Sequence, residues 1–144
     1  MSDRPIVIAS DHAGFELKEV LKAELEAIGV AVEDLGTYDT NAVDYPDMAN
    51  ALAEAVSESA DRRGLLLCGT GIGASIAANR HRGVRAALCH SAETARMARE
   101  HNDANVLVLG GRVTDPDTAR ECLRIFLETD FEGGRHIPRV AKLA

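Results

Sequence analysis

The chain has 144 residues and a mass of 15.4 kDa, which fits one ordinary domain of roughly 100–150 residues. Its formal net charge is −7, from 16 basic and 23 acidic residues. This charge argues against a nucleic-acid binder, because such proteins neutralise phosphates with a basic surface. The 46% hydrophobic fraction includes 2 Tyr, 3 Phe and no Trp, so an aliphatic core is expected.

The cysteines and the N-terminus indicate the compartment. Cys68, Cys89 and Cys122 form an odd, widely spaced set, which differs from the dense pairs of a secreted disulfide scaffold. Residues 1–5 lack a charged start followed by an apolar stretch, and no segment approaches the roughly 20 apolar residues that cross a bilayer. We therefore expect a soluble, cytoplasmic, unprocessed protein with no membrane partner, in which residues 1–144 form a single domain.

Predicted strands and helices alternate along the whole chain. Short apolar runs predict the strands, and apolar residues at helical spacing, with Gly or Pro at the boundaries, predict the helices. In chain order the elements are a strand at 6–9, a helix at 14–28, a strand at 31–35, a helix from Pro46, a strand at 64–68, an Ala-rich helix after Gly73, a strand at 84–89, a helix at 92–100, a strand at 106–109 and a helix from Pro116.

Continuous apolar strands between amphipathic helices are typical of a parallel sheet that is covered on both faces. The sequence predicts a doubly wound α/β domain with a five-stranded parallel sheet in Rossmann-like or flavodoxin-like order, followed by a basic C-terminal tail or short helix. Ligands in this architecture bind at the carboxyl ends of the strands. The polar segments that follow the predicted strands therefore come first as site candidates: Ser10–Gly14, Gly69–Gly73, His90–Ser91 and Gly110–Arg112.

The segment Gly69–Gly73 joins a predicted strand to a predicted helix. Glycines at alternate positions allow backbone N–H groups to approach an oxyanion such as a phosphate or an enolate. Tight packing of strand against helix would explain the same glycines. Dinucleotide binding is disfavoured, because the loop follows the third strand with Gly-x-Gly-x-Gly spacing and the fourth strand does not end in an acidic residue. No Gly-Lys-Ser/Thr follows, so a nucleotide P-loop is not predicted either.

Cys68 ends the strand directly before these glycines. Most strand cysteines are small buried hydrophobic residues. Beside a group of backbone N–H donors and a helix N-terminus, however, ionisation is favoured, and the thiolate could act as a base or a nucleophile. Cys89 and Cys122 lack this setting and are expected to be core residues.

The histidines and the C-terminal arginines leave alternatives open. The five His residues show no metal-ligand spacing, so no metal site is predicted. His12 and His101 could be ordinary loop and helix-end residues. Arg135 and Arg139 would share a helical face and could bind one phosphate together, or could form a solvated basic tail. Pro138 between them is tolerated only at the start of a helix.

Six ordered motifs resemble the ribose-5-phosphate isomerase B family, which is related to the galactose-6-phosphate isomerase subunits. The resemblance covers nearly the whole chain and implies an isomerase that interconverts aldose and ketose phosphates through a cis-enediol, with no metal or organic cofactor. The matching segments are Ser-Asp-His-Ala-Gly-Phe (10–15), Asp-Tyr-Pro-Asp (44–47), Cys-Gly-Thr-Gly-Ile-Gly (68–73), Ser-Ile-Ala-Ala-Asn (75–79), Glu-His-Asn-Asp-Ala-Asn-Val (100–106) and Phe-Glu-Gly-Gly-Arg-His (131–136).

The resemblance implies a role for each matching residue. Cys68 is the expected base between C1 and C2, and Thr70 with the neighbouring loop amides would hold the enediolate oxygen. His101, with Asp11, would open the furanose ring, and Asn102 would contact sugar oxygens. The other expected substrate contacts are His12, Arg112, Arg135 and Arg139 around the phosphate, and the loop residues Gly69, Gly71, Ile72 and Gly73.

Three places matter for these expectations: position 74, and two departures from the family pattern, Ile137-Pro138 and His90. Some members use a Glu a few residues after the Cys position, whereas this chain has Ala74 there, so Cys68 has no substitute. Ile137-Pro138 stands where polar residues are commoner, which affects the pose of Arg139.

The substrate and the assembly remain open at this stage. The expected substrate is ribose 5-phosphate in the non-oxidative pentose phosphate pathway. The alternatives are a six-carbon sugar phosphate, such as allose or galactose 6-phosphate, or a non-catalytic phosphate- or nucleotide-binding module. Family resemblance also implies a homodimer, or a dimer of dimers, with active sites shared between subunits.

Overall fold

The computed structural model describes residues 4–144. Within this range five parallel strands form one sheet in the order β2-β1-β3-β5-β4. The strands are β1 (Ile6–Ser10), β2 (Val32–Asp34), β3 (Gly64–Cys68), β4 (Ala86–Leu88) and β5 (Val106–Gly110). The helices are α1 (Phe15–Ala27), α2 (Tyr45–Ser57), α3 (Ile72–Ala78), α4 (Ala92–Glu100), α5 (Pro116–Glu128) and α6 (Ile137–Ala141), and a 3₁₀ turn, η1, spans Gly134–His136.

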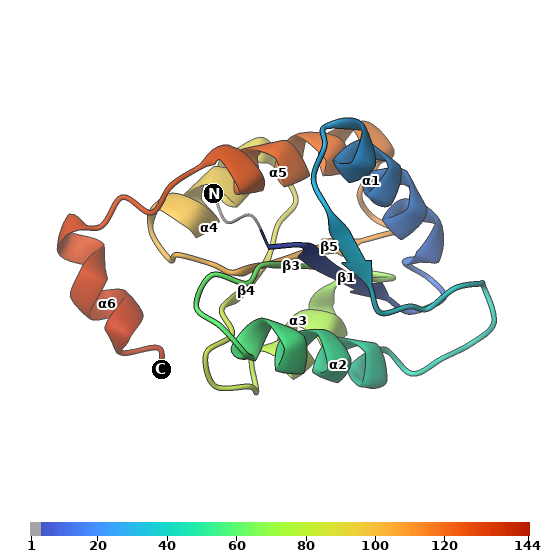
Figure 1. Cartoon of the computed structure of the whole chain (residues 1–144), viewed down its shortest axis with the longest axis horizontal. Helices are drawn as coiled ribbons and strands as arrows, with labels where there is room; N and C mark the ends of the chain where they lie inside the picture. The colour runs from blue at the N-terminus through green and yellow to red at the C-terminus, as the bar shows by residue number, and fades with distance from the viewer. Residues whose placement is uncertain (1–3) are drawn as a thin grey trace.

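The helices cover both faces of the sheet, as the sequence predicts. Figure 1 shows α1, α4 and α5 over one face and α2 and α3 under the other. The alternating strand residues divide into two aliphatic cores accordingly. On β3, for example, Leu65 and Leu67 face the α1, α4 and α5 side, whereas Leu66 and Cys68 face the α2 and α3 side.

The strand order refines the flavodoxin-like expectation. The order of the first three strands, β2-β1-β3, is that of a flavodoxin-like sheet, but the last two strands are exchanged, so that β5 lies inside and β4 forms an edge. All five residues of β5 are buried, whereas those of β4 are half-buried. The predicted strand 84–89 is shorter in the structure: directly before Ala86, the Arg85 N–H donates to the side chain of Asn105 at 2.8 Å and not to a neighbouring strand.

A buried ion pair fixes the edge strand β2 to helix α1. The fully buried ammonium of Lys18 donates to both carboxylate oxygens of Asp34 at 2.7 Å. Burial opposes ionisation of Asp34, but hydrogen bonds from Lys18, the Gly36 N–H and Lys22 outweigh it and hold the pKa of Asp34 below its ordinary value. The turn after β2 is therefore held close to the end of β1, where the Gly36 carbonyl accepts from the Ser10 N–H at 2.7 Å.

The C-terminal tail stands apart from the two helical layers, and α6 projects beyond the sheet in Figure 1. Pro138 lies in the first turn of α6, the place where the missing N–H is tolerated. Arg135 belongs to η1 and Arg139 to α6, so the two do not share one continuous helix.

No helix within residues 4–144 has the length and apolar character needed to cross a bilayer. The expectation that the chain begins without a targeting segment rests partly on residues 1–3, which lie outside the described part.

Candidate active site

An open pocket of about 560 Å³ lies at the carboxyl ends of β1, β3 and β5, where the fold predicts a ligand site. Segments that are far apart in the sequence build its walls. The lining residues are Asp11, His12, Ala13, Tyr45, Cys68, Gly69, Thr70, Ile72, Gly73, Ile76 and Arg112.

Cys68 contributes a buried thiol to this pocket. The residue is 4% exposed, and its sulfur accepts a hydrogen bond from the Gly71 N–H, with 3.1 Å between N and Sγ. The thiol forms no disulfide, and neither do Cys89 and Cys122, which are buried away from the pocket wall. An N–H that points at the sulfur stabilises negative charge there, which suits a proton acceptor.

The loop after Cys68 needs glycine at position 71. Gly71 has φ of +82°, and a Cβ there would lie 2.5 Å from Leu88 and 3.2 Å from the Leu109 backbone. The tight turn carries the Gly71 N–H back onto the Cys68 sulfur. Thr70 is exposed at the pocket, and its hydroxyl accepts from the Ile72 N–H at 3.2 Å, which fixes the side chain over the loop. The loop can therefore offer a hydroxyl beside a thiol.

Backbone N–H groups from two different segments hold the side chains of Asp11 and His12 in place. The buried Asp11 carboxylate accepts from the Gly14 N–H at 3.0 Å. The His12 Nδ1 accepts from the Val43 N–H at 3.2 Å. Because a backbone N–H can only donate, Nδ1 is the acceptor, which leaves Nε2 as the ring nitrogen that can donate. His12 is thus prepared as a hydrogen-bond donor at the pocket.

Arg112 supplies positive charge to the pocket. Its backbone N–H donates to the Gly69 carbonyl at 2.8 Å, and the neighbouring Gly111 N–H donates to the Cys68 carbonyl at 2.8 Å. The Arg112 side chain lies so close to Gly69 that a Cβ there would be 3.3 Å from it. These contacts place a guanidinium, suited to a phosphate or carboxylate, across the loop from the thiol.

The structure adds lining residues that the sequence analysis assigned no role. Tyr45, Ala13 and Ile76 line the pocket. The ring of Tyr45 lies against Gly73, where a Cβ would come within 2.4 Å of it. The motif Asp-Tyr-Pro-Asp (44–47) was a signal for this position, but nothing in the spacing connects a residue at the start of α2 with the loop after β3.

Of the other predicted site residues, Gly71 binds the Cys68 sulfur through its N–H but does not line this pocket, and neither do His101, Asn102, Arg135 and Arg139. Helix α4 begins after the carboxyl end of β4 and ends before β5 starts, so His101 and Asn102 lie at the amino ends of the strands. Asn102 lines a second pocket of about 400 Å³ beside the start of β4. The structure of one chain therefore divides the predicted residues between opposite ends of the sheet.

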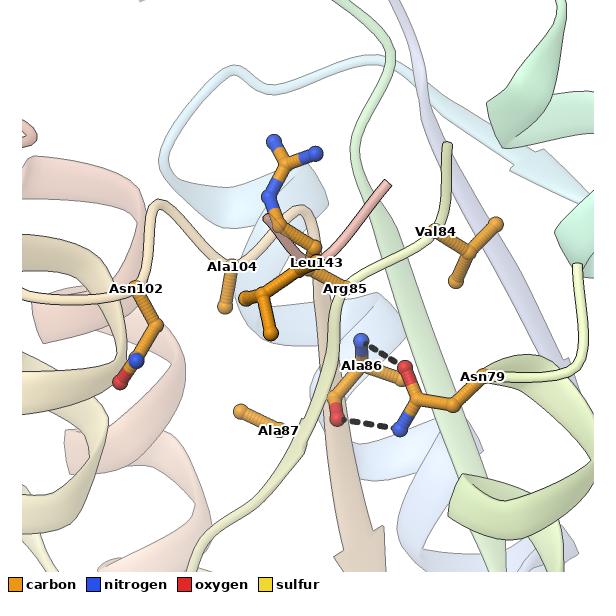
Figure 2. A pocket seen from close by; sticks show the side chains of 8 residues that line it. All are labelled: Asn79, Val84, Arg85, Ala86, Ala87, Asn102, Ala104 and Leu143. Atoms are coloured by element: carbon orange, nitrogen blue, oxygen red, sulfur yellow. Dashed lines mark hydrogen bonds between the residues drawn. The ribbon is translucent and has the colours of Figure 1, made fainter. Parts of the chain in front are cut away.

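Figure 2 shows this second pocket and the residues around it. Asn102 and Arg85 present polar groups, and the Asn79 amide pairs with the backbone of Ala86. Much of the remaining wall is aliphatic, formed by Val84, Ala86, Ala87, Ala104 and, from the C-terminal tail, Leu143.

Three side chains near the tail, His101, Glu132 and His136, bring possible metal-ligand atoms within 4.8 Å of one another. The two imidazole rings, however, are stacked, with 4.4 Å between centroids and 17° between planes. Because the two ring planes are nearly parallel, the in-plane lone pairs of the two imidazoles do not point to one common position. One ion therefore could not bind both rings. Glu132 also contacts the guanidinium of Arg135 at 3.7 Å. The arrangement therefore does not have the geometry of a metal site.

A thiol, a fixed imidazole and a guanidinium at the carboxyl edge of a doubly wound sheet are typical of an enzyme that binds a small anion. Comparison with known proteins narrows the class. Residues 6–143 match the model of the Ribose/Galactose Isomerase family. The chain belongs to this family and is an aldose–ketose isomerase.

Solved structures and a curated relative are closely similar. A ribose 5-phosphate isomerase from Thermotoga maritima superposes with a TM-score of 0.94 at 52% identity, over 96% of each chain. The Mycoplasma genitalium ribose-5-phosphate isomerase B, solved with bound ribulose-5-phosphate, gives a TM-score of 0.94 at 42% identity, over 96% of this chain and 93% of that one. Ribose-5-phosphate isomerase B of Escherichia coli is 42% identical over 95% of this chain and 92% of its own length.

Proposed function

We propose that this chain interconverts ribose 5-phosphate and ribulose 5-phosphate through a cis-enediol, as one domain acting in the cytoplasm within the non-oxidative pentose phosphate pathway. The observation that carries the proposal is the buried Cys68 thiol beside backbone donors in a pocket that also holds Arg112. Relatives named for ribose 5-phosphate, one of them with bound ribulose-5-phosphate, support the substrate.

In this proposal Cys68 moves the proton between C2 of the aldose and C1 of the ketose. The thiolate takes the C2 proton, the electron pair forms the C1–C2 double bond, and the carbonyl oxygen becomes an enediolate. Thr70 and the loop amides after Cys68 stabilise this oxygen, because fixed donors act where the charge develops. Transfer of the hydroxyl proton from O2 to O1 and return of the carbon-bound proton to C1 give the ketose, so the step needs no redox partner.

His12 and Arg112 are proposed to hold the phosphate. The Val43 N–H occupies Nδ1 of His12, so the ring can donate through Nε2, and Arg112 adds a permanent charge. Arg135 and Arg139 are proposed to complete this end of the substrate. Asp11, His101 and Asn102 are assigned to ring opening and to the sugar oxygens.

Because Cys68 and His101 lie at opposite ends of the sheet, we propose that the active site forms between two copies of the chain. Each subunit of a homodimer, or of a dimer of dimers, supplies Cys68 and its loop to one site and His101, Asn102, Arg135 and Arg139 to the other. The tail that carries the two arginines supports this arrangement, since the Glu132 N–H donates to the Glu100 carbonyl and so keeps the tail at the His101 end of the sheet.

The test is an isomerase assay on ribose 5-phosphate, allose 6-phosphate and galactose 6-phosphate with the wild type and with Cys68→Ala. We expect the highest kcat/KM on the pentose phosphate and a loss of kcat of about 10²–10⁴-fold in a folded Cys68→Ala protein. Full activity of this variant would contradict the role of Cys68. Tight nucleotide binding by calorimetry without any isomerisation would favour the non-catalytic module instead.

A further inference from the structure

His136 is a buried residue whose ring nitrogen Nε2 has no hydrogen-bond partner among the described residues. It ends the turn η1 and is 5% exposed. Its Nε2 makes no hydrogen bond to any described residue and lies 3.8 Å from Glu132 Oε1.

The main contact of the His136 ring is with His101. The ring centroids are 4.4 Å apart and the planes are inclined by 17°. His101 follows the last residue of α4, is half-buried, and its ring makes no hydrogen bond within residues 4–144; only its backbone is tied, through the N–H to Met97. Stacking on His136 therefore restricts the plane of the His101 ring.

The tail is attached to α4 at this point. The Glu132 N–H donates to the Glu100 carbonyl at 3.0 Å, which places the turn η1 beside the end of α4. Desolvation and the nearby charges of Arg135, His101 and Arg139 lower the pKa of His136, while Glu132 opposes them. A neutral His136 ring can lie against His101 in either charge state of His101 without repelling it.

We propose that His136 is a positioning residue that holds the ring of His101, by stacking, in the orientation that ring opening of the substrate requires. This inference rests on the proposed function, in which His101 transfers the proton that opens the furanose. His136 acts through His101 and has no contact with the reacting carbons. Its own aromatic face, rather than its nitrogens, carries this role.

The experiment compares His136→Ala with the matched variant His136→Phe, which keeps an aromatic face. Ribose 5-phosphate closes to a furanose through O4, whereas erythrose 4-phosphate cannot, because its O4 carries the phosphate. We expect His136→Ala to lower kcat/KM on ribose 5-phosphate about 10- to 100-fold, because the His101 ring is no longer held in a productive orientation. Conversion of erythrose 4-phosphate should be unaffected, and His136→Phe should restore the pentose rate.

A second readout is independent of activity. NMR of protein labelled at histidine should show a restrained His101 ring, shifted by the stacked neighbour, in the wild type and in His136→Phe, and a mobile one in His136→Ala. Equal losses on both sugars, no loss on the pentose, or an unchanged His101 signal in His136→Ala would each overturn the proposal. If the wild type converts neither sugar, the proposed function fails, and the NMR comparison alone decides the positioning role.

Discussion

Cys68 and Cys89 lie at the carboxyl ends of β3 and β4, yet their surroundings differ. The Cys68 sulfur accepts a backbone N–H in the wall of the pocket. Burial raises the pKa of the Cys89 thiol to about 11, despite a hydrogen bond from Thr94. Cys122 lies in the core cluster with Cys89, and burial raises its pKa as well. We therefore expect position relative to backbone donors, and not the residue type, to separate a reactive thiol from a structural one.

This difference predicts selective alkylation. At pH 8 a thiol of pKa about 11 is ionised to roughly one part in a thousand, so iodoacetamide should label Cys68 first, with parallel loss of isomerase activity. Ribose 5-phosphate should protect Cys68 from labelling and the enzyme from the loss of activity. Peptide mass spectrometry over a time course measures the order of labelling, and Cys89→Ser provides the control with unchanged kinetics. Labelling of Cys89 or Cys122 before Cys68 would contradict the prediction.

At the scale of elements, the loop between β3 and α3 depends on the left-handed backbone of Gly71. Replacing it by Ala should cost about 1–3 kcal/mol in strain, and the new Cβ would meet Leu88 at 2.5 Å. We also expect a large fall in kcat, because a displaced turn withdraws the N–H from the Cys68 sulfur. Gly29→Ala is the matched control: its φ is +80°, no atom lies within 4 Å of the added Cβ, and it is remote from the pocket.

Thermal unfolding and steady-state kinetics on both glycine variants measure these effects. Both should lose stability, but only Gly71→Ala should lose activity. An active Gly71→Ala enzyme would mean that the turn does not control the thiol.

The Lys18–Asp34 pair links α1 to β2 and makes stability depend on pH. Since the pKa of Asp34 is lower in the folded chain than in the unfolded one, the pair stabilises the fold above the unfolded value near 3.9, and this contribution falls as pH decreases towards the folded value. Asp34→Asn, which removes the nearer carboxylate from the buried Lys18 and leaves only Glu19 at 3.6 Å, should cost about 3 kcal/mol at pH 7. Denaturant unfolding should show that the difference in unfolding free energy between wild type and Asp34→Asn is smaller at pH 3 than at pH 7.

The control for this pair is Lys22→Met, because Lys22 contacts the same carboxylate at 3.3 Å from a more exposed position. Its effect at pH 7 should stay below about 1 kcal/mol. A gap between wild type and Asp34→Asn that is equal at both pH values would exclude the ion pair as the source of the pH dependence.

The sequence predicts those features of the elements that depend on local patterns, but not those that depend on packing between distant segments. Periodicity and caps predict the bounds of β3 and α4 correctly, because these are local properties. The order of β4 and β5 is not local: both are short apolar runs, and only packing places Val106–Gly110 inside and Ala86–Leu88 at the edge. The contact of Tyr45 with Gly73 is unpredictable from spacing for the same reason.

At the scale of the whole molecule, the net charge of −7 does not exclude an anionic ligand, because Arg112 provides a local positive charge in the pocket. Sequence motifs also identify His101 and Asn102, yet one chain holds them away from Cys68. A motif records which residues belong to a site but not which copy supplies them. The distance between these groups in one fold is what points to a second subunit.

Subunit complementation tests this arrangement. Cys68→Ala and His101→Asn should each be inactive on ribose 5-phosphate. In a mixed dimer with a shared site, one site carries both defects and the other has the intact Cys68 of one chain and the intact His101 of its partner. After equal mixing and subunit exchange, half of the dimers are mixed, so activity should return to about a quarter of wild type.

The control mixture combines Cys68→Ala with Thr70→Ala, two defects in the same group of residues. Under the shared arrangement each site of this mixed dimer receives one defective loop, so no activity should return. Native mass spectrometry of differently tagged chains confirms exchange in both mixtures. Recovery in neither mixture, with mixed dimers present, would place Cys68 and His101 in sites that a single chain must complete, and the tail would then have to close over its own sheet to bring Arg135 and Arg139 to the phosphate.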